Sequence, residues 1–400
     1  MSSFFKKFSN VKFRDILHLF LFIAALPVAL IYKRRRRDLW LVCDNGVEAA
    51  DNGFVFFKYV REKHPEQDCV FAVNKNSPDR EKVERVGNTV NYGSFKHWIL
   101  YLTARVNISS QKGGKPNYAV CNLLEVYGIL KNSRVFLQHG IIYNDLEFLH
   151  YNNSKMSLFI TSTERERKFI VEKFGYPEDK VKLTGIARLD NLHNFEVCEG
   201  QILIMPTWRE WLGNSTLTKN IKKNIAEFKN TEYYENWNKL LSSEKLKTLC
   251  STHSLKLMFY LHRDAQRFAD CFNAYGDHVK VCKYPEYKVD ELLKTSAFLI
   301  TDYSSIHMDF AYMKKPIAYL QFDYDKFYSE HYREGYFTFD KDGFGPTFRE
   351  TEELIEYIEK SAKNNLQNEE KYLARHSSFF TLYDTENCKR NYEAIKEQWS

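Results

Sequence analysis

Short apolar runs recur along the chain after residue 37, and polar segments with helical spacing separate them. This alternation is typical of parallel α/β sheets, whose strands are buried on both faces and are followed by covering helices. The predicted strands of a first sheet are Leu39–Cys43, Cys69–Val73, Val106–Ser109, Val135–Leu137, Leu158–Thr161 and Val181–Thr184. Those of a second sheet are Ile202–Met205, Leu257–Leu261, Val279–Val281, Phe298–Thr301 and Ile317–Tyr319.

The length of 400 residues suits two or three domains. We expect an N-terminal Rossmann-like domain over residues 38–195 and a C-terminal one over 196–383, with the boundary near Leu192–Gly200. The polar, aromatic-rich stretch Trp211–Ser251 predicts inserted helices, and a last helix within 384–400, about Thr385–Trp399, is expected to pack back on the first domain. In two facing α/β domains the ligand site lies in the cleft, at the carboxyl ends of strands.

An almost purely apolar stretch, Ile16–Tyr32, precedes the first strand. Its flanking cations are Lys6, Lys7, Lys12 and Arg14 before it and Lys33, Arg34, Arg35, Arg36 and Arg37 behind it. A cleavable secretory signal needs a small-residue cleavage site after its apolar core, whereas the five cations found here would oppose translocation. About 17 residues is also the lower limit for crossing a bilayer. We expect residues 1–37 to lie peripherally on the cytoplasmic face of the cell membrane, with both flanks on anionic lipid. The alternative is a buried helix of the first domain with solvated flanks.

Composition narrows the class of protein. The formal charge is +6, but residues 1–37 hold nine Lys and Arg against one Asp, so the rest of the chain is about −2 and no nucleic-acid partner is indicated. The eight cysteines are scattered, without the close pairs of a zinc or redox site, which suits reduced thiols in a cytoplasmic protein. We expect neither metal nor cofactor, because cationic side chains and backbone dipoles can take the place of a metal ion.

The strongest local signal is the segment Phe298–Asp309, where an apolar strand ends in hydroxyl-bearing residues and enters a helix. Ser304 and Ser305 are natural N-cap residues there, and Asp309 lies one turn beyond Ser305. A helix start also offers free N–H groups to a phosphate. Capping of a structural helix and phosphate binding are both open at this point.

A second signal is the segment Phe136–Asp145, again a strand that ends in polar residues. His139 is placed at the carboxyl edge of the sheet, where an imidazole can take a proton from a hydroxyl near neutral pH. Gly140 beside it permits close approach of a ligand to the backbone. A structural histidine is the alternative.

A third cluster contains three turns that each follow an apolar run. They place Arg188, Thr207, Arg209, His262 and Arg263 near one edge of the second sheet. Guanidinium groups and hydroxyls at strand ends suit a diphosphate. Each arginine could instead be a surface ion-pair residue.

Together these residues resemble the CDP-glycerol glycerophosphotransferase family, the teichoic-acid primases and polymerases of bacterial cell walls, over about residues 38–390. The motifs that carry the resemblance are Ile-Thr-Asp-Tyr-Ser-Ser-x-x-x-Asp at 300–309, Lys315-Pro316, Phe322-Asp323, Pro-Thr-Trp-Arg at 206–209 and Gly-x-x-Arg-x-Asp at 185–190. The resemblance implies a GT-B fold and a CDP-linked alditol donor held mainly by the C-terminal domain. It implies an acceptor, a lipid-linked saccharide or polymer, that approaches the N-terminal side near the membrane.

The resemblance also implies roles for particular residues. His139 matches the family's catalytic histidine and His262 its second essential histidine. The positions that match donor contacts are Arg188, Thr207, Ser304, Ser305 and Asp309. Two departures concern substrate choice: Ile141 and Ile142 stand where the polymerases read Thr-Pro, and Arg263 follows His262 instead of preceding it.

The expected reaction is attack of an acceptor hydroxyl on the β-phosphorus of a CDP-alditol, with His139 as base and CMP as leaving group. His262, Arg209 and the helix start at Ser304–Ser305 would meet the phosphate charge. Two rival hypotheses are a GT-B glycosyltransferase that uses a nucleotide sugar and a non-catalytic membrane scaffold of the same fold. Release of CMP would indicate the expected reaction, and release of UDP would indicate the glycosyltransferase. A lack of turnover with every CDP-alditol would favour the non-catalytic scaffold.

Overall fold

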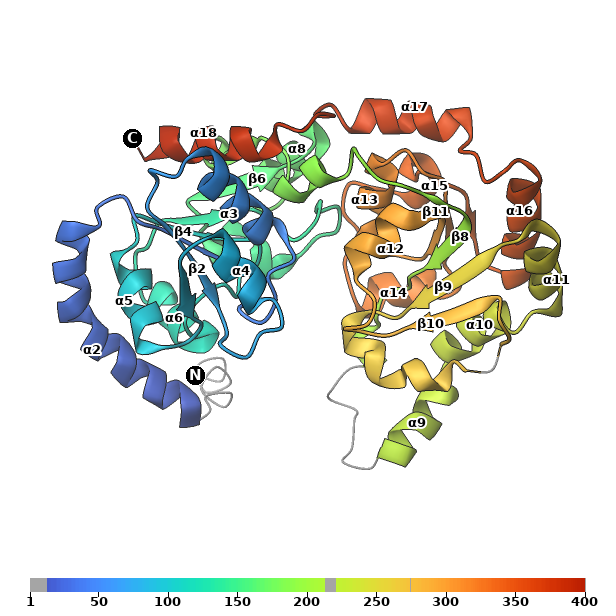
Figure 1. The fold of residues 1–400 in the computed structure, drawn as a ribbon, viewed down its shortest axis with the longest axis horizontal. Coiled ribbons are helices and arrows are strands. Elements are labelled where there is room, and N and C mark those ends of the chain that lie inside the picture. The colour runs from blue at the N-terminus through green and yellow to red at the C-terminus, as the bar shows by residue number, and fades with distance from the viewer. Residues whose placement is uncertain (1–12, 213–220, 274, 400) are drawn as a thin grey trace. The chain divides into compact units, whose positions relative to one another are not determined.

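The computed structural model describes residues 13–212, 221–273 and 275–399 (Figure 1). Contacts divide the chain into two units. The first comprises Met1–Ile141, Glu147–Asp190 and Asp384–Ser400, and the second comprises Ile142–Leu146 and Asn191–Tyr383. The short segment Ile142–Leu146 thus belongs to the second unit although strands of the first unit precede and follow it.

The first unit is built on a parallel sheet with the strand order β3-β2-β1-β4-β5-β6-β7. The strands are β1 (Trp40–Cys43), β2 (Cys69–Val73), β3 (Thr89–Asn91), β4 (Val106–Ser109), β5 (Arg134–Phe136), β6 (Leu158–Thr161) and β7 (Val181–Leu183). The helices are α2 (Phe13–Arg35), α3 (Asn52–Lys63), α4 (Arg80–Val86), α5 (Phe95–Thr103), α6 (Tyr118–Val126), α7 (Tyr151–Ser154), α8 (Glu164–Glu172) and α18 (Asn387–Gln398), with 3₁₀ turns η1 (Glu147–Leu149), η2 (Glu178–Lys180) and η3 (Ala187–Asn191).

Both faces of this sheet are covered, and β1 shows why. Its alternate residues Trp40 and Val42 pack into one apolar cluster with α3 and α18, while Leu41 and Cys43 pack into another with α5 and α6. Successive side chains of a strand point to opposite faces, so a strand buried on both sides must be apolar throughout. This is the reason that the strands stand out as continuous apolar runs in the sequence.

Helix α2 packs one face on the first unit and leaves the other exposed. Phe22, Ala25 and Ala29 are buried, and the indole nitrogen of Trp98 on α5 donates a hydrogen bond to Nδ1 of His18 at 3.0 Å. Large apolar side chains stay exposed on the opposite side: Ile16, Leu17, Leu19, Phe20, Ile23, Leu26, Leu30, Ile31 and Tyr32. The stretch is therefore a helix packed on the first unit that also presents an exposed apolar face, and attachment to a membrane stays a prediction. The cations Lys6, Lys7 and Lys12 lie outside the described residues.

Helix α18 closes the first unit from the far end of the chain. The carboxylate of Asp190 accepts hydrogen bonds from the backbone N–H groups of Asn387 and Cys388, at 2.9 and 2.8 Å, where α18 begins. This supplies the missing partners of the helix start. The ring of Tyr392 stacks on His64 at 3.6 Å between ring centres. The acidic end of the Gly-x-x-Arg-x-Asp motif thus has a structural role in fastening α18.

The second unit has a parallel sheet with the strand order β10-β9-β8-β11-β12-β13. The strands are β8 (Cys198–Ile204), β9 (Lys256–Tyr260), β10 (Val279–Cys282), β11 (Ser296–Thr301), β12 (Ile317–Leu320) and β13 (Thr347–Phe348). The helices are α9 (Ile221–Lys229), α10 (Glu232–Leu241), α11 (Glu244–His253), α12 (Val289–Thr295), α13 (Ile306–Tyr312), α14 (Tyr324–Glu330), α15 (Phe339–Asp342), α16 (Thr351–Lys363) and α17 (Glu370–Phe379), with 3₁₀ turns η4 (Glu210–Leu212) and η5 (Arg263–Cys271).

The segment Ile142–Leu146 is anchored in this second unit. The hydroxyl of Tyr143 donates a hydrogen bond to the carbonyl of Tyr303 at 2.6 Å, and the backbone N–H of Asp145 donates to the carbonyl of Arg333 at 3.0 Å. Tyr143 follows His139 by four residues in the sequence. The chain therefore passes from the first unit into the second directly after this predicted site residue.

The predicted strands correspond to observed ones with end shifts, the largest at β8, which starts at Cys198 instead of Ile202. The edge strands β3 and β13, of three and two residues, were not predicted, because so short a stretch gives no apolar period. The helices expected between Trp211 and Ser251 are α9, α10 and α11.

Candidate active site

In the first unit the carboxyl ends of neighbouring strands bring charged side chains together. Asp44 follows β1, Ser110 follows β4, His139 follows β5 and Arg188 follows β7. Parallel strands end at the same edge of a sheet, so residues far apart in sequence meet there. One further residue at this edge, Asp51, directly precedes α3 and was not predicted.

Asp51 and His139 form the centre of this cluster. Nδ1 of His139 lies 2.5 Å from Oδ2 of Asp51, and the carboxylate is nearly buried while the histidine side chain is 68% exposed. The negative charge of Asp51 raises the pKa of His139 above its ordinary value, although partial loss of hydration opposes this. Burial alone would raise the pKa of Asp51, but the charges of His139 and Arg188 keep it below its ordinary value. A hydrogen bond at Nδ1 leaves Nε2 as the nitrogen that can accept a proton.

Arg188 holds the same carboxylate from the other side. Its guanidinium lies 3.1 Å from Oδ1 of Asp51 and donates a hydrogen bond to the carbonyl of His139. The side-chain oxygen of Asn52 accepts a hydrogen bond from the backbone N–H of Arg188 at 2.8 Å, and its amide donates to the carbonyl of Gln138 at 2.7 Å. The prediction that Arg188 lies at an edge of the second sheet is wrong, because Arg188 follows β7 of the first sheet and contacts Asp51 and His139 there.

The backbone turns sharply just before His139. Gln138 has a φ of 65°, in the left-handed region that a non-glycine residue seldom adopts. Its buried side chain donates a hydrogen bond to the carbonyl of Ile160, which helps to hold this conformation. Such an arrangement costs about 1 kcal/mol or more and is found where a side chain must be aimed. The glycine that follows, Gly140, is half-buried beside the exposed ring of His139.

A second carboxyl group, Asp44, lies behind Asp51. It is buried and accepts hydrogen bonds from the Ser110 hydroxyl at 2.7 Å and from the backbone N–H of Gly53 at 2.9 Å. Burial, together with the charge of Asp51, raises the pKa of Asp44 to about 7. Asp44 thus supports the loop before α3 from inside.

In the second unit two predicted site residues, Thr207 and Arg209, lie in the turn after β8. Arg209 is fully buried: its guanidinium lies 2.7 Å from Asp323 and 2.8 Å from Asp302. Burial works against the charged form, but the charges of these two carboxylates nevertheless raise the pKa of Arg209. Arg209 therefore belongs to a buried ion-pair network whose carboxylates already neutralise its charge. It is neither a surface ion-pair residue nor a cation at an open strand end.

Thr207 lies at the edge of that network. Its backbone N–H donates to Asp302 at 2.8 Å, and its carbonyl accepts from Arg209 at 2.7 Å. Its hydroxyl oxygen is buried and has no hydrogen-bond partner in the described part of the chain. A buried polar atom without a partner costs free energy, so this hydroxyl is a candidate ligand contact.

The turn after β11 does not form the expected side-chain cap. Ser305 occupies the N-cap position of α13, but with helical backbone angles and without a side-chain hydrogen bond to the helix. Ser304 is half-buried and Ser305 exposed, while Asp309 is buried in the first turn of α13. The capping interpretation is therefore wrong for the hydroxyls, since a cap requires an extended N-cap residue whose oxygen accepts a backbone N–H.

The two residues after β9 lie nearer the solvent. His262 starts η5, and its Nδ1 accepts a hydrogen bond from the backbone N–H of Asp264 at 3.3 Å, with 43% of the side chain exposed. Arg263 is exposed, and its guanidinium lies over the ring of Tyr284 at 5.4 Å. Within the described residues, no group of three His, Cys, Asp or Glu is arranged to hold a metal ion.

Comparison with known proteins identifies the family. The family model described as CDP-Glycerol:Poly(glycerophosphate) glycerophosphotransferase matches residues 25–397. The chain belongs to this family. Relatives include the minor teichoic acid biosynthesis protein GgaB of Bacillus subtilis, 33% identical over 90% of this chain and 40% of that protein. A teichoic acid poly(glycerol phosphate) polymerase of Bacillus spizizenii is 30% identical over 66% of this chain and 53% of its own length. The chain thus spans about half or less of the relatives' length.

Solved structures support the GT-B-like fold of this family member. A structure of the wall teichoic acid polymerase TagF aligns with 96% of this chain and 99% of its own, with a TM-score of 0.66 at 16% identity. A UDP-N-acetylglucosamine 2-epimerase from Listeria monocytogenes aligns with 91% of the chain and 97% of its own, with a TM-score of 0.56 at 12% identity. The predicted fold class, two α/β units with parallel sheets and an apolar N-terminal helix, is confirmed.

Proposed function

We propose that the chain transfers glycerol phosphate, or a related alditol phosphate, from a CDP-activated donor to a hydroxyl of a teichoic-acid or capsule precursor. The acceptor oxygen bonds to the β-phosphorus, the bridging bond to the α-phosphate breaks, and CMP leaves. Membership of the glycerophosphotransferase family supports the reaction class. The observation that carries the proposal is the 2.5 Å pair of Asp51 with an otherwise exposed His139.

His139 acts as the general base. Its Nε2 accepts the proton of the attacking hydroxyl, since Nδ1 is directed at Asp51. Asp51 is a positioning residue: it holds the tautomer and stabilises the imidazolium that forms. Arg188 holds Asp51 in place through the 3.1 Å ion pair. The raised pKa of His139 makes the ring a stronger base than an isolated histidine.

The donor phosphates bind to hydroxyls of the second unit. Thr207 offers a buried hydroxyl without a partner among the described residues, and the hydroxyls of Ser304 and Ser305 are not used as helix caps. His262 and Arg263, which are partly or fully exposed, meet the charge of the leaving phosphate. Arg209 contributes indirectly, because it fixes Asp302 and thereby the backbone of Thr207.

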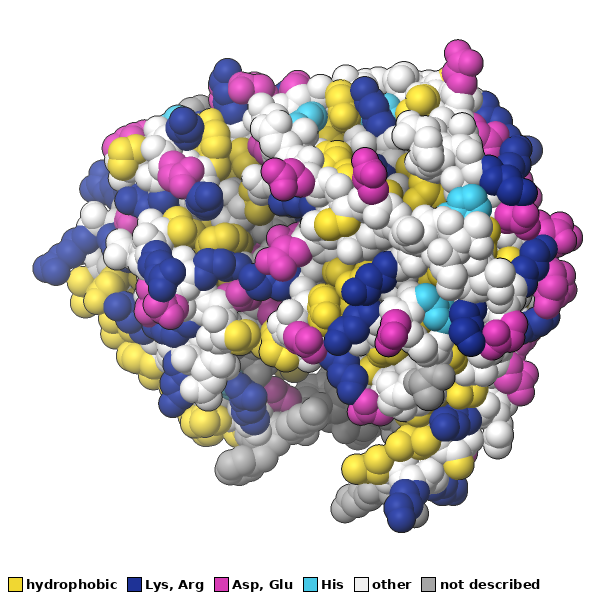
Figure 2. Space-filling model, turned by 45° about the vertical axis from the view of Figure 1, so that its right-hand side comes forward, with side chains coloured by type: hydrophobic (Ala, Val, Ile, Leu, Met, Phe, Trp, Pro, Cys, Tyr) yellow, Lys and Arg dark blue, Asp and Glu magenta, His cyan; other side chains and the backbone are white. Residues whose placement is uncertain are grey.

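Helix α2 attaches the protein peripherally to an anionic membrane surface on the cytoplasmic side. The helix is long and apolar enough to span a bilayer by length and composition. Its buried residues Phe22, Ala25 and Ala29 nevertheless lie along its middle, against the first unit, so we favour a helix in the plane of the interface. In Figure 2 hydrophobic and Lys or Arg side chains lie together along the left-hand edge, the side on which Figure 1 draws α2. A lipid-linked acceptor is available at such a surface.

The test offers the purified protein CDP-glycerol, CDP-ribitol and UDP-sugars with lipid-linked disaccharide acceptors. We expect CMP release and a product that is heavier by one alditol phosphate in mass spectrometry. UDP release would support the glycosyltransferase hypothesis, and absence of turnover with every donor would support a non-catalytic scaffold.

A further inference from the structure

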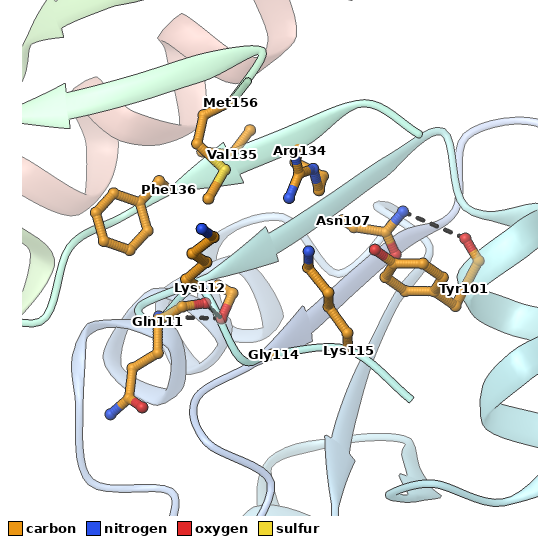
Figure 3. Close-up of a pocket in the computed structure, with 11 residues that line it drawn as sticks. Tyr101, Asn107, Gln111, Lys112, Gly114, Lys115, Arg134, Val135, Phe136 and Met156 are labelled. Carbon is orange, nitrogen blue, oxygen red and sulfur yellow. Dashed lines mark hydrogen bonds between the residues drawn. The ribbon is translucent and has the colours of Figure 1, made fainter. Parts of the chain in front are cut away.

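A small pocket of about 20 Å³ lies in the first unit, beside strands β4 and β5 (Figure 3). Three cationic residues line it: Lys112, Lys115 and Arg134. In Figure 3 their charged ends point into the same space. This volume is far below the roughly 300–1,000 Å³ typical of pockets for drug-sized ligands, so the pocket suits a small group and not a whole nucleotide.

The positive charge of this pocket exceeds its negative charge. Glu125 on α6 pairs with Lys115 at 2.6 Å and with Arg134 at 3.0 Å, and all three side chains are nearly buried. Lys112 pairs with no carboxylate in the described structure; its ammonium donates to the carbonyls of Phe148 and Asn153, each at 2.8 Å. Three cations thus face one carboxylate. Burial, and then the neighbouring charges of Lys115 and Arg134, lower the pKa of Lys112 to about 8.

Lys112, the cation without a carboxylate partner in the described structure, is half-buried beside two buried cations, and a bound anion would relieve this local excess of positive charge. Two ammonium groups and a guanidinium that approach from different sides match the several oxygens of a phosphate ester better than they match a single carboxylate. The net positive charge attracts either kind of phosphate ester, since a diester carries one negative charge and a monoester about two.

The pocket is also connected to the proposed base. Ser109, which lines it, and the next residue, Ser110, donate hydrogen bonds to Asp44, at 3.3 Å to its carbonyl and 2.7 Å to its carboxylate. Asp44 in turn accepts from the backbone N–H of Asp51 at 3.3 Å. Lys112 and His139 each stand three residues beyond the ends of the paired strands β4 and β5.

The same loop is fastened to the proposed membrane helix. The side-chain amide of Asn117, two residues after Lys115, donates to Asp15 on α2 at 2.8 Å. A phosphate in this pocket would therefore lie between the attachment helix and the base, in a place that suits the acceptor substrate.

We propose that Lys112, Lys115 and Arg134 form a phosphate subsite that binds a phosphate ester on the acceptor side, separate from the residues that hold the CDP donor. The assignment of this subsite to the acceptor rests on the proposed function. The existence of the subsite itself does not. The phosphate ester belongs either to a soluble glycerol-phosphate polymer or to a lipid headgroup, and the two sources share this chemistry.

The experiment measures binding to the full chain with the donor residues saturated by CDP. One arm titrates a soluble glycerol-phosphate oligomer by calorimetry, and the other sediments the protein with vesicles that contain phosphatidic acid. The variants are Lys112→Gln, Glu125→Gln and, as a matched control, Lys168→Gln, whose side chain is 70% exposed on α8. Melting temperatures and CDP affinity are recorded for each.

We expect Lys112→Gln to weaken binding by about tenfold or more in the arm whose phosphate ester is the natural ligand. This is the effect expected for the loss of a charge-assisted hydrogen bond. Glu125→Gln should tighten binding in the same arm, because it frees two cations from their carboxylate. CDP affinity should not change in Lys112→Gln. The subsite proposal would be overturned if Lys112→Gln bound the phosphate ester as well as Lys168→Gln does in both arms. It would also be overturned if Glu125→Gln weakened binding as Lys112→Gln does. A wild-type protein that binds phosphate but releases no CMP would refute the proposed function alone.

Discussion

Replacement of Asp51 by Asn tests the pairing that underlies the proposed base. Two opposite charges about 4 Å apart near a protein surface attract by about 4 kcal/mol. The His139 side chain is 68% exposed, so solvent screening reduces this to roughly 2–3 kcal/mol for the imidazolium that forms in the transition state. At about 1.36 kcal/mol per tenfold change in rate, Asp51→Asn should lower kcat about 30- to 150-fold.

The pH profile provides a second measurement on the same variant. A base works when it is unprotonated, so wild-type kcat/KM should rise with pH through the raised pKa of His139, on the high side of about 6.5. Without the Asp51 charge that pKa falls, and the acidic limb should move to lower pH although the maximum rate is smaller. Asp179→Asn, an exposed aspartate of the same unit, is the matched control. An unmoved limb with a rate within about threefold of wild type would refute the pairing argument.

Three further predictions concern the second unit and α2. Ser304→Ala combined with Ser305→Ala should raise the KM for the CDP donor about tenfold or more, while urea unfolding changes by less than about 0.5 kcal/mol, since neither hydroxyl caps α13. Arg209→Met should lower the free energy of unfolding by about 3–5 kcal/mol in urea titrations, because it leaves two buried aspartates without their cation. The double substitution Phe20→Ser and Leu30→Ser should release the protein from anionic vesicles in sedimentation assays. The melting temperature should change little, because these two residues are 65% and 68% exposed. An unchanged donor KM in the double serine variant, an unchanged stability in Arg209→Met, or continued vesicle binding by the Phe20 and Leu30 double variant would each contradict the argument behind that prediction.

The sheets could be predicted because their strands are buried on both faces. A strand such as β2, Cys69–Val73, is apolar at every position, and its bounds can be read from the sequence. The edge strands β3 and β13 could not, since two or three residues with partial exposure leave no recognisable pattern. The packed face of α2 was also hidden, because both sides of that helix are apolar.

The candidate site was predicted in part. His139 stands at the expected strand end, but its partner Asp51 is 88 residues earlier and looks like an ordinary acid before a helix. The available signal was its place in the short Asp51-Asn-Gly segment that starts α3 after β1. Arg209 was expected to face phosphate, and the carboxylates that draw it into the core, Asp302 and Asp323, lie far later in the chain. Long-range charge pairing of this kind has no local sequence signature.

The most direct test of the account is CMP release by His139→Ala with CDP-glycerol and saturating acceptor. We expect turnover to fall by about a hundredfold or more while affinity for the CDP donor stays near that of the wild type, because loss of a general base affects the transition state more than the ground state. His262→Ala should instead lower both donor affinity and turnover. Near-normal CMP release by a folded His139→Ala protein would contradict the assignment of His139 as the base and leave it a structural histidine.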